Sequence, residues 1–553
     1  MASLIALPVL AVVLHVFQPG GDVWSHLAGT VLPRYVANTF WLMIGVGIGV
    51  LVLGVATAWL VAMCRFPGQR LWEWALLLPL AVPTYVIAYA YTDFLQFAGP
   101  LQSGLREVLG WGRGDYWFPQ IRSLGGAVTV MTLVLYPYVY LLARAAFLEQ
   151  SVCVLEVGRT LGRGPWRLFG TVALPLARPA IAGGTALALM ETLNDFGAVQ
   201  HFGVDTFTTG IYRTWFGLGE PVAAAQLASL LLVFVVFLVL LERYSRGEAR
   251  FFNATSRYRV LPRHDLTGWR GALACATCAV PVVLGFLLPA GLLGQMAVTA
   301  GDPMFGPRFL ELAANSLTLA TVAGVLAVAL ALVVGYSLRS AEGRLTGASA
   351  RVAAMGYAIP GSVIAVGVLQ PLGFLDQQIN ARFSDWFDVA PGLLLSGSLV
   401  ALVYAYLVRF LAVSLSSVEA SLEKVTPSMD GAARTLGLSP ARTLLRVHLP
   451  LTRSSLLAAG ILVFVDVMKE LPATVILRPF DFDTLAIRAY ELASDERLSQ
   501  ASTSALAIVA VGIVPVIMLS RALTRSRPGH GADASASAGK TNTWEGSRAS
   551  STT

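Results

Sequence analysis

Apolar stretches of about 20 residues recur along the whole chain and are separated by short polar segments. A helix of that length crosses the roughly 30 Å hydrocarbon core of a bilayer, so each stretch is a candidate membrane span. The first lacks a preceding basic segment and a small-residue cleavage site, so we expect a retained helix rather than a signal peptide. The pattern predicts twelve spans, over residues 2–17, 39–63, 72–95, 124–146, 178–199, 222–241, 271–296, 312–338, 352–374, 391–415, 454–476 and 503–520.

The basic residues predict the orientation of these spans. Short cytoplasmic loops of membrane proteins carry an excess of Lys and Arg. Arginines gather in every second loop, while the loops between are mixed or acidic, as at Asp481 and Asp483. We therefore expect both termini on the cytoplasmic side of the membrane.

Composition supports a membrane protein and excludes most other classes. Of 553 residues, 56% are hydrophobic and 13% are charged, whereas soluble proteins carry about 25% charged residues. The net charge of +7 follows from loop topology and does not indicate nucleic-acid binding. The four cysteines form no disulfide framework, and Cys275 and Cys278 lie in an apolar run without neighbours typical of a zinc or redox site.

The chain contains an internal repeat. Arg159–Gly162 reads Arg-Thr-Leu-Gly and recurs as Arg434–Gly437, 275 residues later, while Pro83 and Pro360 are related by 277 residues. Each copy holds six spans, so an even number places both copies the same way up in the membrane. The offset of 275 also relates Phe207, Thr209 and Arg213 to Phe482, Thr484 and Arg488.

The repeat divides the chain into four segments. We expect a first six-helix repeat at 1–247, a basic cytoplasmic linker at 248–270, a second repeat at 271–525, and a disordered cytoplasmic tail at 526–553. The tail is rich in Ser, Ala, Gly and Thr and contains Gly-Lys-Thr, but it lacks the other glycine and the strand that a phosphate-binding loop needs.

One cytoplasmic loop in each repeat carries the most specific pattern, at about 148–178 and 418–453. Gly162 and Gly437 can take the positive φ that ends a helix. A new short helix is predicted to begin at Pro165 and Pro440, and we expect Pro175 and Pro450 to break it. Each repeat would then present a short amphipathic helix suited to a groove on a partner.

These loops resemble the signature of the membrane subunits of binding-protein-dependent ABC importers, which reads E-A-A, three residues, G, nine residues, I-x-L-P. Val157 and Gly158 depart from the alanines, and Gly431 departs from the glutamate beside Asp430. The resemblance implies a type I importer fold, coupling helices that insert into an ATPase dimer, and a location in the inner membrane of a bacterial cell. The coupling residues are Glu156, Gly158, Arg159, Gly162, Pro165, Arg167 and Pro175 in the first loop, and Ala432, Ala433, Arg434, Gly437, Pro440, Arg442 and Pro450 in the second.

The segment Glu191–Val199 and the residues that follow it are similar to the fused two-repeat permeases of ferric-iron importers. The likeness covers nearly the whole chain and implies a cytoplasmic ATPase dimer and an extracytoplasmic iron-binding protein as partners. It also implies that this chain performs no chemistry and holds no cofactor, since ATP and Mg would bind the ATPase. The mechanism implied is alternating access.

Four carboxylates within the spans predict the translocation path. Glu191 and Asp195 share a helical face, and adding 275 gives Asp466 and Glu470. Ionisable groups within spans usually face a bundle interior or a water-filled path, and hard oxygen donors suit Fe(III). We expect a transient path rather than a tight metal site, with contact foremost at Glu191 and Asp466.

Other interpretations of these residues stay open at this stage. The acids can instead cap helix ends or pair with Arg213, Arg488 or Lys469 to hold a gate shut. Further oxygen donors are Tyr85, Tyr89, Tyr136 and Tyr138, although packing is the commoner role of such tyrosines. Thiamine, a polyamine or a phosphonate are alternative cargoes, and a secondary transporter independent of an ATPase is the alternative class.

Overall fold

The computed structural model describes residues 2–18, 21–112, 114–149, 165–246, 264–302, 306–340, 355–388, 391–422 and 425–525. Almost all of them are helical. The first repeat contains α1 (Ala2–Leu14), α2 (Gly21–Thr30), α3 (Leu32–Met63), α4 (Gln69–Ala75), α5 (Thr84–Leu95), α6 (Pro100–Leu109), α7 (Leu124–Glu149), α9 (Pro165–Leu168), α10 (Leu174–Asn194), α11 (Gly197–His201), α12 (Phe207–Tyr212) and α13 (Pro221–Arg246).

The second repeat has a corresponding order of helices. It contains α14 (Trp269–Val282), α15 (Leu288–Ala300), α16 (Pro307–Ser340), α18 (Gly361–Phe387), α19 (Leu399–Leu422), α20 (Pro427–Thr435), α21 (Pro440–Thr443), α22 (Leu449–Met468), α23 (Pro472–Leu477), α24 (Leu485–Ser494) and α25 (Leu498–Arg525). A parallel pair of two-residue strands, β1 (Cys64–Arg65) and β2 (His264–Asp265), ties the end of α3 to the chain before α14.

The membrane-spanning character of the chain is confirmed. Within the described residues, eight helices are long and apolar enough to cross a membrane, and two bent helix pairs raise the number to ten. The other two predicted spans correspond to a shorter apolar helix, Leu4–Phe17, and to α18. The protein is an all-α polytopic membrane protein built from two repeats, each with six membrane-spanning helices.

Several predicted spans have different bounds from those expected, because prolines and caps interrupt them. The span predicted at 72–95 bends by 90° between Gln69–Ala81 and Thr84–Leu109, where Pro83 is extended with ψ of 142°. The span predicted at 352–374 gives a helix only from Gly361, after Pro360. The spans predicted at 178–199 and 454–476 end early, at Asn194 and Met468.

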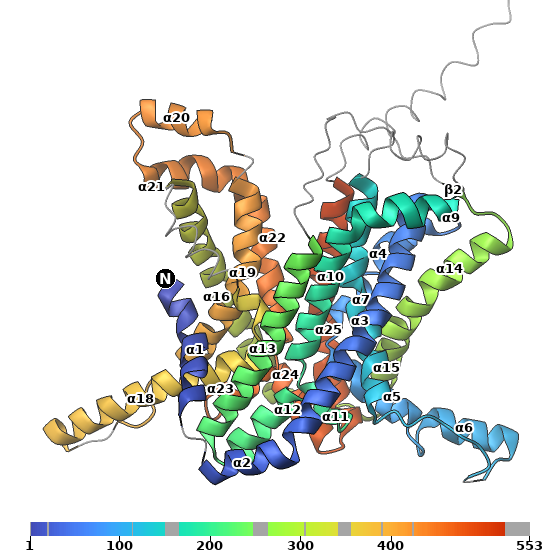
Figure 1. Ribbon diagram of the computed structural model, residues 1–553, viewed down its shortest axis with the longest axis horizontal. Coiled ribbons are helices and arrows are strands. Elements are labelled where there is room, and N and C mark those ends of the chain that lie inside the picture. Colours follow the sequence, from blue (N-terminus) through green and yellow to red (C-terminus); the bar gives the residue numbers. More distant parts are fainter. Residues whose placement is uncertain are drawn as a thin grey trace, which may run out of the picture.

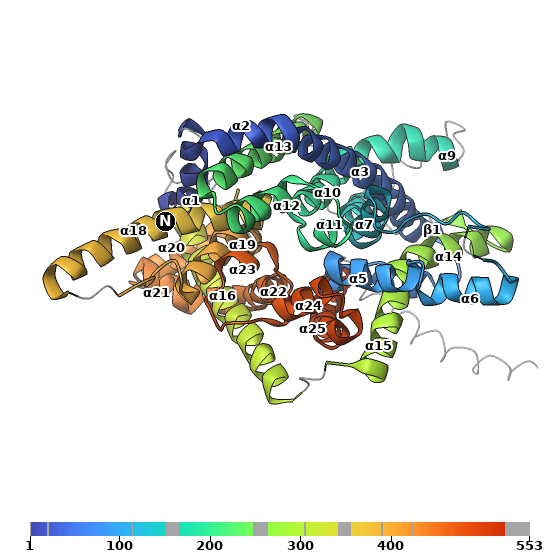
Figure 2. The ribbon, with the colours of Figure 1, turned by 90° about the horizontal axis from the view of Figure 1, so that it is seen from below.

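The first helices of the two repeats are exchanged. Helix α1 packs on α18 of the second repeat, and the Leu4 carbonyl accepts a hydrogen bond from Tyr404. Reciprocally, α14 and α15 pack beside the first repeat, where Tyr91 donates to the Leu284 carbonyl at 2.7 Å. Figure 2 shows α1 and α15 on opposite sides of the helix bundle. Each repeat therefore contributes to the other's core.

Equivalent contacts recur in the two repeats. Asn38 donates to the Asp205 carbonyl at 2.9 Å, and Asn315 donates to the Asp483 carbonyl at 3.2 Å. Thr206 and Thr484 are the N-caps of α12 and α24. The sequence pattern paired Thr209 with Thr484, but the structural equivalent of Thr484 is Thr206. The offset of 275 residues is therefore wrong by three in this region, because the second repeat has three more residues between Glu470 and α24 than the first has between Asp195 and α12.

Helices α9 and α20 lie at the same end of the molecule, and α2 lies at the opposite end (Figure 1). We call these ends the α20 face and the α2 face. Residues 248–263 of the predicted linker, the tail at 526–553, and Glu156, Gly158, Arg159 and Gly162 of the first loop lie outside the described residues.

Candidate translocation pocket and coupling loop

A pocket of about 70 Å³ lies between the two repeats. It is lined by side chains of α10 and α22, by the chain that follows each of them, and by the start of α5. All four carboxylates that the repeat singled out line this pocket. The ionisable side chains in the lining are Glu191, Asp195, Asp466 and Glu470, together with Arg409 and Lys469.

Asp195 and Glu470 each hold the start of a second short helix. One oxygen of Asp195 accepts from the backbone N–H groups of Ala198 and Val199 at 3.0 and 3.1 Å. Glu470 accepts from Ala473 and Thr474 at 2.9 and 3.0 Å. These N–H groups lie at the unpaired start of a helix, where a carboxylate satisfies them and complements the helix dipole.

The two caps have different additional partners. In the first repeat, the Thr84 hydroxyl donates to Asp195. The equivalent position in the second repeat is Gly361, and a Cβ there would lie 2.7 Å from Glu470 and 2.8 Å from Arg409. The missing side chain leaves room for the Arg409 guanidinium, which donates to Glu470 at 3.0 Å.

Arg409 also links the two repeats. Its other terminal nitrogen lies 3.4 Å from Glu191 of the first repeat. The side chains of Arg409 and Glu470 are 4% and 1% exposed, while that of Glu191 is 22% exposed. Nearby, the Gly361 N–H donates to the Asn194 side chain at 2.6 Å, a second bond across the repeats. These contacts close the pocket between α10 and α19.

The remaining acid, Asp466, pairs with Lys469 at 3.0 Å. The alternative interpretation of the acids therefore describes the structure. Asp195 and Glu470 cap helices, and Lys469 forms an ion pair with Asp466. The suggested pairing with Arg213 and Arg488 is wrong, because these contact Asp205 at 2.5 Å and Asp302 at 3.1 Å.

Arg409 was missed in the sequence analysis. Arg409 lies in α19, and α7, the corresponding helix of the first repeat, has no arginine at the equivalent position. The repeat therefore did not reveal it. A lone arginine in an apolar run was the available signal. Of the proposed tyrosines, Tyr85 and Tyr138 line the pocket, whereas the Tyr136 hydroxyl donates to the Leu76 carbonyl at 2.8 Å.

Within the described residues, no group of three or more His, Cys, Asp or Glu side chains is arranged to hold a metal ion. Each carboxylate in the pocket already has a hydrogen-bond or ion-pair partner. The lining carries four acids and two bases, a formal excess of two negative charges. This arrangement can attract a cation once the ion pairs separate.

The second coupling loop has the predicted helix, glycine and short-helix order. Helix α20 ends before Gly437, whose φ of 75° lies in the left-handed region that favours glycine. Helix α21 then begins at Pro440, with Ser439 as its cap. The predicted break at Pro450 is wrong, because a π-helical turn over Leu444–His448 leads into α22 and the bend of 71° comes after Arg453. Pro175 likewise lies in the first turn of α10.

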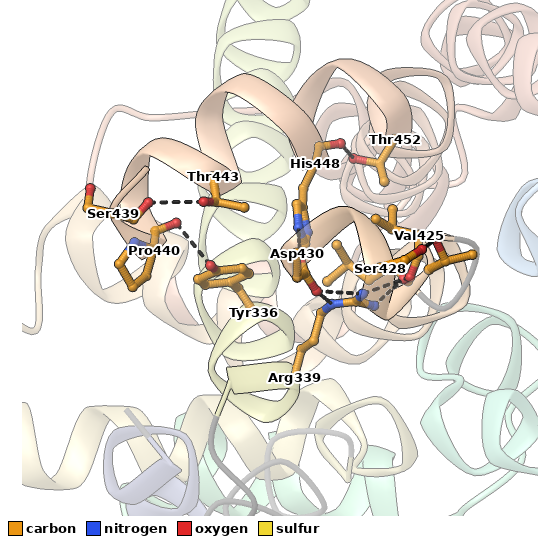
Figure 3. A network of polar contacts seen from close by, with 12 residues as sticks. Tyr336, Arg339, Val425, Ser428, Asp430, Ser439, Pro440, Thr443, His448 and Thr452 are labelled. Carbon is orange, nitrogen blue, oxygen red and sulfur yellow. Dashed lines mark hydrogen bonds and ion pairs between the residues drawn. The ribbon is translucent and has the colours of Figure 1, made fainter. Parts of the chain in front are cut away.

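An ion network fastens α20 to the bundle (Figure 3). Arg339 at the end of α16 contacts Asp430 at 2.8 Å and donates to the carbonyls of Leu422 and Val425, both at 2.7 Å. The buried His448 ring contacts the other Asp430 oxygen at 2.6 Å. Burial opposes ionisation of Asp430, but the hydrogen bonds from Arg339 and His448 outweigh it and lower its pKa.

Several coupling residues lie on the open surface of this loop. Arg434 occupies the last turn of α20, and Arg442 the last turn of α21. Leu436 is 80% exposed, between the two helices. Ala433 is buried, whereas Ala432 is exposed. In the described part of the first loop, Arg167 lies in α9.

Replacing Arg409 by Gln should strongly destabilise the protein. The change leaves Glu470 buried without its cation, and breaking a buried pair costs about 3–5 kcal/mol. Thermal unfolding in detergent measures this. The control is Arg213→Gln, which breaks a pair whose arginine is 48% exposed and should cost less than about 1 kcal/mol. Equal stability of the two variants would contradict the assignment.

Replacing Asp430 by Asn should loosen α20 without unfolding the bundle. The wild-type carboxylate, with its lowered pKa, contributes stability at neutral pH that is lost only as the pH falls through that value. Hydrogen exchange of residues 427–435 should therefore speed up in the variant at neutral pH. The wild type should show comparable exchange only in acid. Unchanged protection of α20 in Asp430→Asn would refute this role of the network.

Comparison with known proteins agrees with this architecture. Residues 50–245 match the family model of the binding-protein-dependent transport system inner membrane component. The Fe(3+)-transport system permease protein FbpB 2 of Haemophilus influenzae is 26% identical over 499 residues, which are 89% of this chain and 90% of the relative.

Two further relatives match a shorter part of the chain. The molybdenum transport system permease protein ModB of Escherichia coli is 34% identical over 28% of this chain and 63% of its own length. The putative 2-aminoethylphosphonate transport system permease protein PhnU of Salmonella choleraesuis is 30% identical over 29% of this chain and 56% of its own. With the duplicated fold, these matches make the chain similar to the inner-membrane permeases of binding-protein-dependent ABC importers, in the form that carries both repeats in one chain.

Proposed function

We propose that this permease moves ferric iron from an extracytoplasmic iron-binding protein into the cytoplasm. The observation that carries the proposal is the meeting of four carboxylates from both repeats in one pocket. Carboxylate oxygens are hard donors, which suit a small, highly charged cation. The likeness to an Fe(3+)-transport permease over nine-tenths of both chains supports the same cargo.

The proposal includes the orientation and the partners. The α20 face lies in the cytoplasm, because its loops carry most of the arginines, and both termini lie on that side. The two coupling loops, with the residues assigned to them above, dock on an ATPase dimer. ATP and Mg bind that ATPase, and this chain acts by changing shape, without a cofactor or chemistry of its own.

The ion pairs suggest how the pocket opens. Arg409 joins Glu191 of one repeat to Glu470 of the other, so the pocket is closed while that bridge is intact. When ATP closes the ATPase dimer, the coupling helices move together and rock the repeats apart. Glu191 and Asp466 then face the path, whereas Asp195 and Glu470 keep their helix N-termini. The exposed pair of acids makes transient contacts with iron.

An oxyanion is the second candidate cargo. Arg409 and Lys469 line the same pocket, and two partial relatives are named for molybdenum and 2-aminoethylphosphonate transport. The excess of carboxylates and the full-length likeness favour iron. Transport by the chain without an ATPase would instead indicate a secondary transporter.

The double variant Glu191→Gln with Asp466→Asn tests the path. In proteoliposomes with the ATPase and the binding protein, we expect uptake of radioactive iron to fall about tenfold, because two of the cation's contacts are lost. ATPase activity should persist, since α20 is untouched. The control is Glu311→Gln, an acid 51% exposed on the surface. Normal iron uptake at normal ATPase activity by the double variant would defeat the proposal.

Replacing Gly437 by Pro tests the coupling loop. Proline cannot adopt the positive φ of this turn, so α20 and α21 should lose their relative position and ATP hydrolysis should no longer drive uptake. Gly431→Ala is the matched control, because this glycine lies within α20 and a Cβ there meets nothing within 4 Å. Normal uptake with the ATPase retained in a pull-down of Gly437→Pro would contradict the assignment.

A further inference from the structure

Two buried tyrosines of α5 lack a hydrogen-bond partner for their hydroxyl among the described residues. Tyr85 and Tyr89 are 4% and 3% exposed. A buried polar group without a partner costs about 1–3 kcal/mol, so such a group requires an explanation. Four other buried tyrosine hydroxyls are all bonded, namely Tyr91 to Leu284, Tyr136 to Leu76, Tyr140 to Glu73 and Tyr406 to Thr474.

The two tyrosines form part of a continuous row. They are four residues apart and therefore share one face of α5. Tyr85 lines the pocket with Asp195. The ring centroids of Tyr85 and Tyr89 are 5.7 Å apart, and that of Tyr89 lies 4.8 Å from the ring of His201 at the end of α11. The His201 Nε2 is likewise buried without a partner in the described structure.

The row leads from the pocket toward the α2 face. Helices α5 and α11 both start at the pocket and pack against each other, and Figure 2, seen from the α2 face, shows them side by side near its middle. Arg122 lies near His201. Arg122 pairs at 3.6 Å with Glu496, which is 78% exposed. The row therefore joins the pocket to a charged outer surface.

The second repeat provides an internal comparison. Aligned from Pro83 and Pro360, Tyr89 corresponds to Val366. Aligned from the capping acids, His201 corresponds to Ile476. Both second-repeat residues are buried. Tyr85 corresponds to Ser362, which is buried and polar, so the comparison shows only that the fold does not require polar atoms at the Tyr89 and His201 positions.

We propose that Tyr85, Tyr89 and His201 form a one-sided binding route for the trivalent iron cation between the outer surface and the pocket. This rests on the proposed function, both for the cargo and for the orientation. Phenolate oxygen and imidazole nitrogen are established donors to iron. Each phenol that binds the ion releases one proton. Asp195 beside Tyr85 can accept the proton of Tyr85, and the His201 ring beside Tyr89 can accept that of Tyr89; each proton returns to its phenol when the ion moves on. Several weak sites in sequence let an ion enter and still leave.

The test uses the complete complex with its ATPase and binding protein in nanodiscs and proteoliposomes. Ferric nitrilotriacetate is added to the vanadate-trapped complex, and visible absorption reports iron–phenolate charge transfer. The variant is Tyr85→Phe with Tyr89→Phe, which removes only the two unbonded hydroxyls and should leave thermal stability unchanged. The control is Tyr136→Phe with Tyr140→Phe, which removes two bonded hydroxyls away from the row.

We expect the wild type and the control to show the iron-dependent band, and the Tyr85 and Tyr89 variant to lose it. Iron uptake by that variant should fall about tenfold at unchanged ATPase activity. If the wild type transports iron and the variant keeps both the band and normal uptake, the route is refuted while the proposed function stands. If the wild type transports no iron, the proposed function itself fails and the route fails with it.

Discussion

The structure depends on how the backbone N–H groups are hydrogen-bonded where two membrane spans, α10 and α22, are interrupted. Inside a bilayer, every N–H group must find a partner within the protein. Asp195 and Glu470 meet this requirement at the starts of α11 and α23. The same two carboxylates bring the breaks, and thus the ends of α10 and α22, to one place between the repeats. The pocket is the direct result of these two caps.

Duplication supplies the framework, and differences between the copies supply the specificity. The place of Thr84 in the first repeat is taken by Gly361 in the second, and the space so created holds Arg409. Arg409 thereby pairs with the capping acid Glu470 of its own repeat and with Glu191 of the other repeat. Tyr89 and His201 beside α5 likewise have apolar counterparts, Val366 and Ile476, in the second copy. A symmetric scaffold thus encloses a pocket whose two walls have different chemistry.

The loop that contains α20 and α21 is linked to this pocket through α22. Asp430 fixes α20 to α16 through Arg339 and to the start of α22 through His448. Helix α22 in turn ends at Met468, beside the pocket. Under the proposed function, a displacement of α20 would reach Asp466 and Glu470 through α22, which bends by 71° after Arg453.

Much of the fold followed from the sequence, because long apolar runs and a repeat at a fixed offset are strong signals. The four carboxylates were found by the same repeat, and the structure brings them to one pocket. The helix breaks at Asn194 and Met468 were not predicted, since apolar residues resume soon after the polar pairs Asn194-Asp195 and Lys469-Glu470, and only the caps reveal the breaks. Arg409 escaped because it has no counterpart in the first copy. The coupling role of the first loop stays a prediction for Glu156, Gly158, Arg159 and Gly162, which lie outside the described residues.

The central claim is that the pocket between the repeats carries a cation. It is tested most directly by competing cargoes in one preparation of wild-type proteoliposomes containing the ATPase and an iron-binding protein. The account predicts ATP-dependent accumulation of radioactive iron that an excess of molybdate or 2-aminoethylphosphonate does not reduce. Accumulation of either anion without accumulation of iron would contradict it.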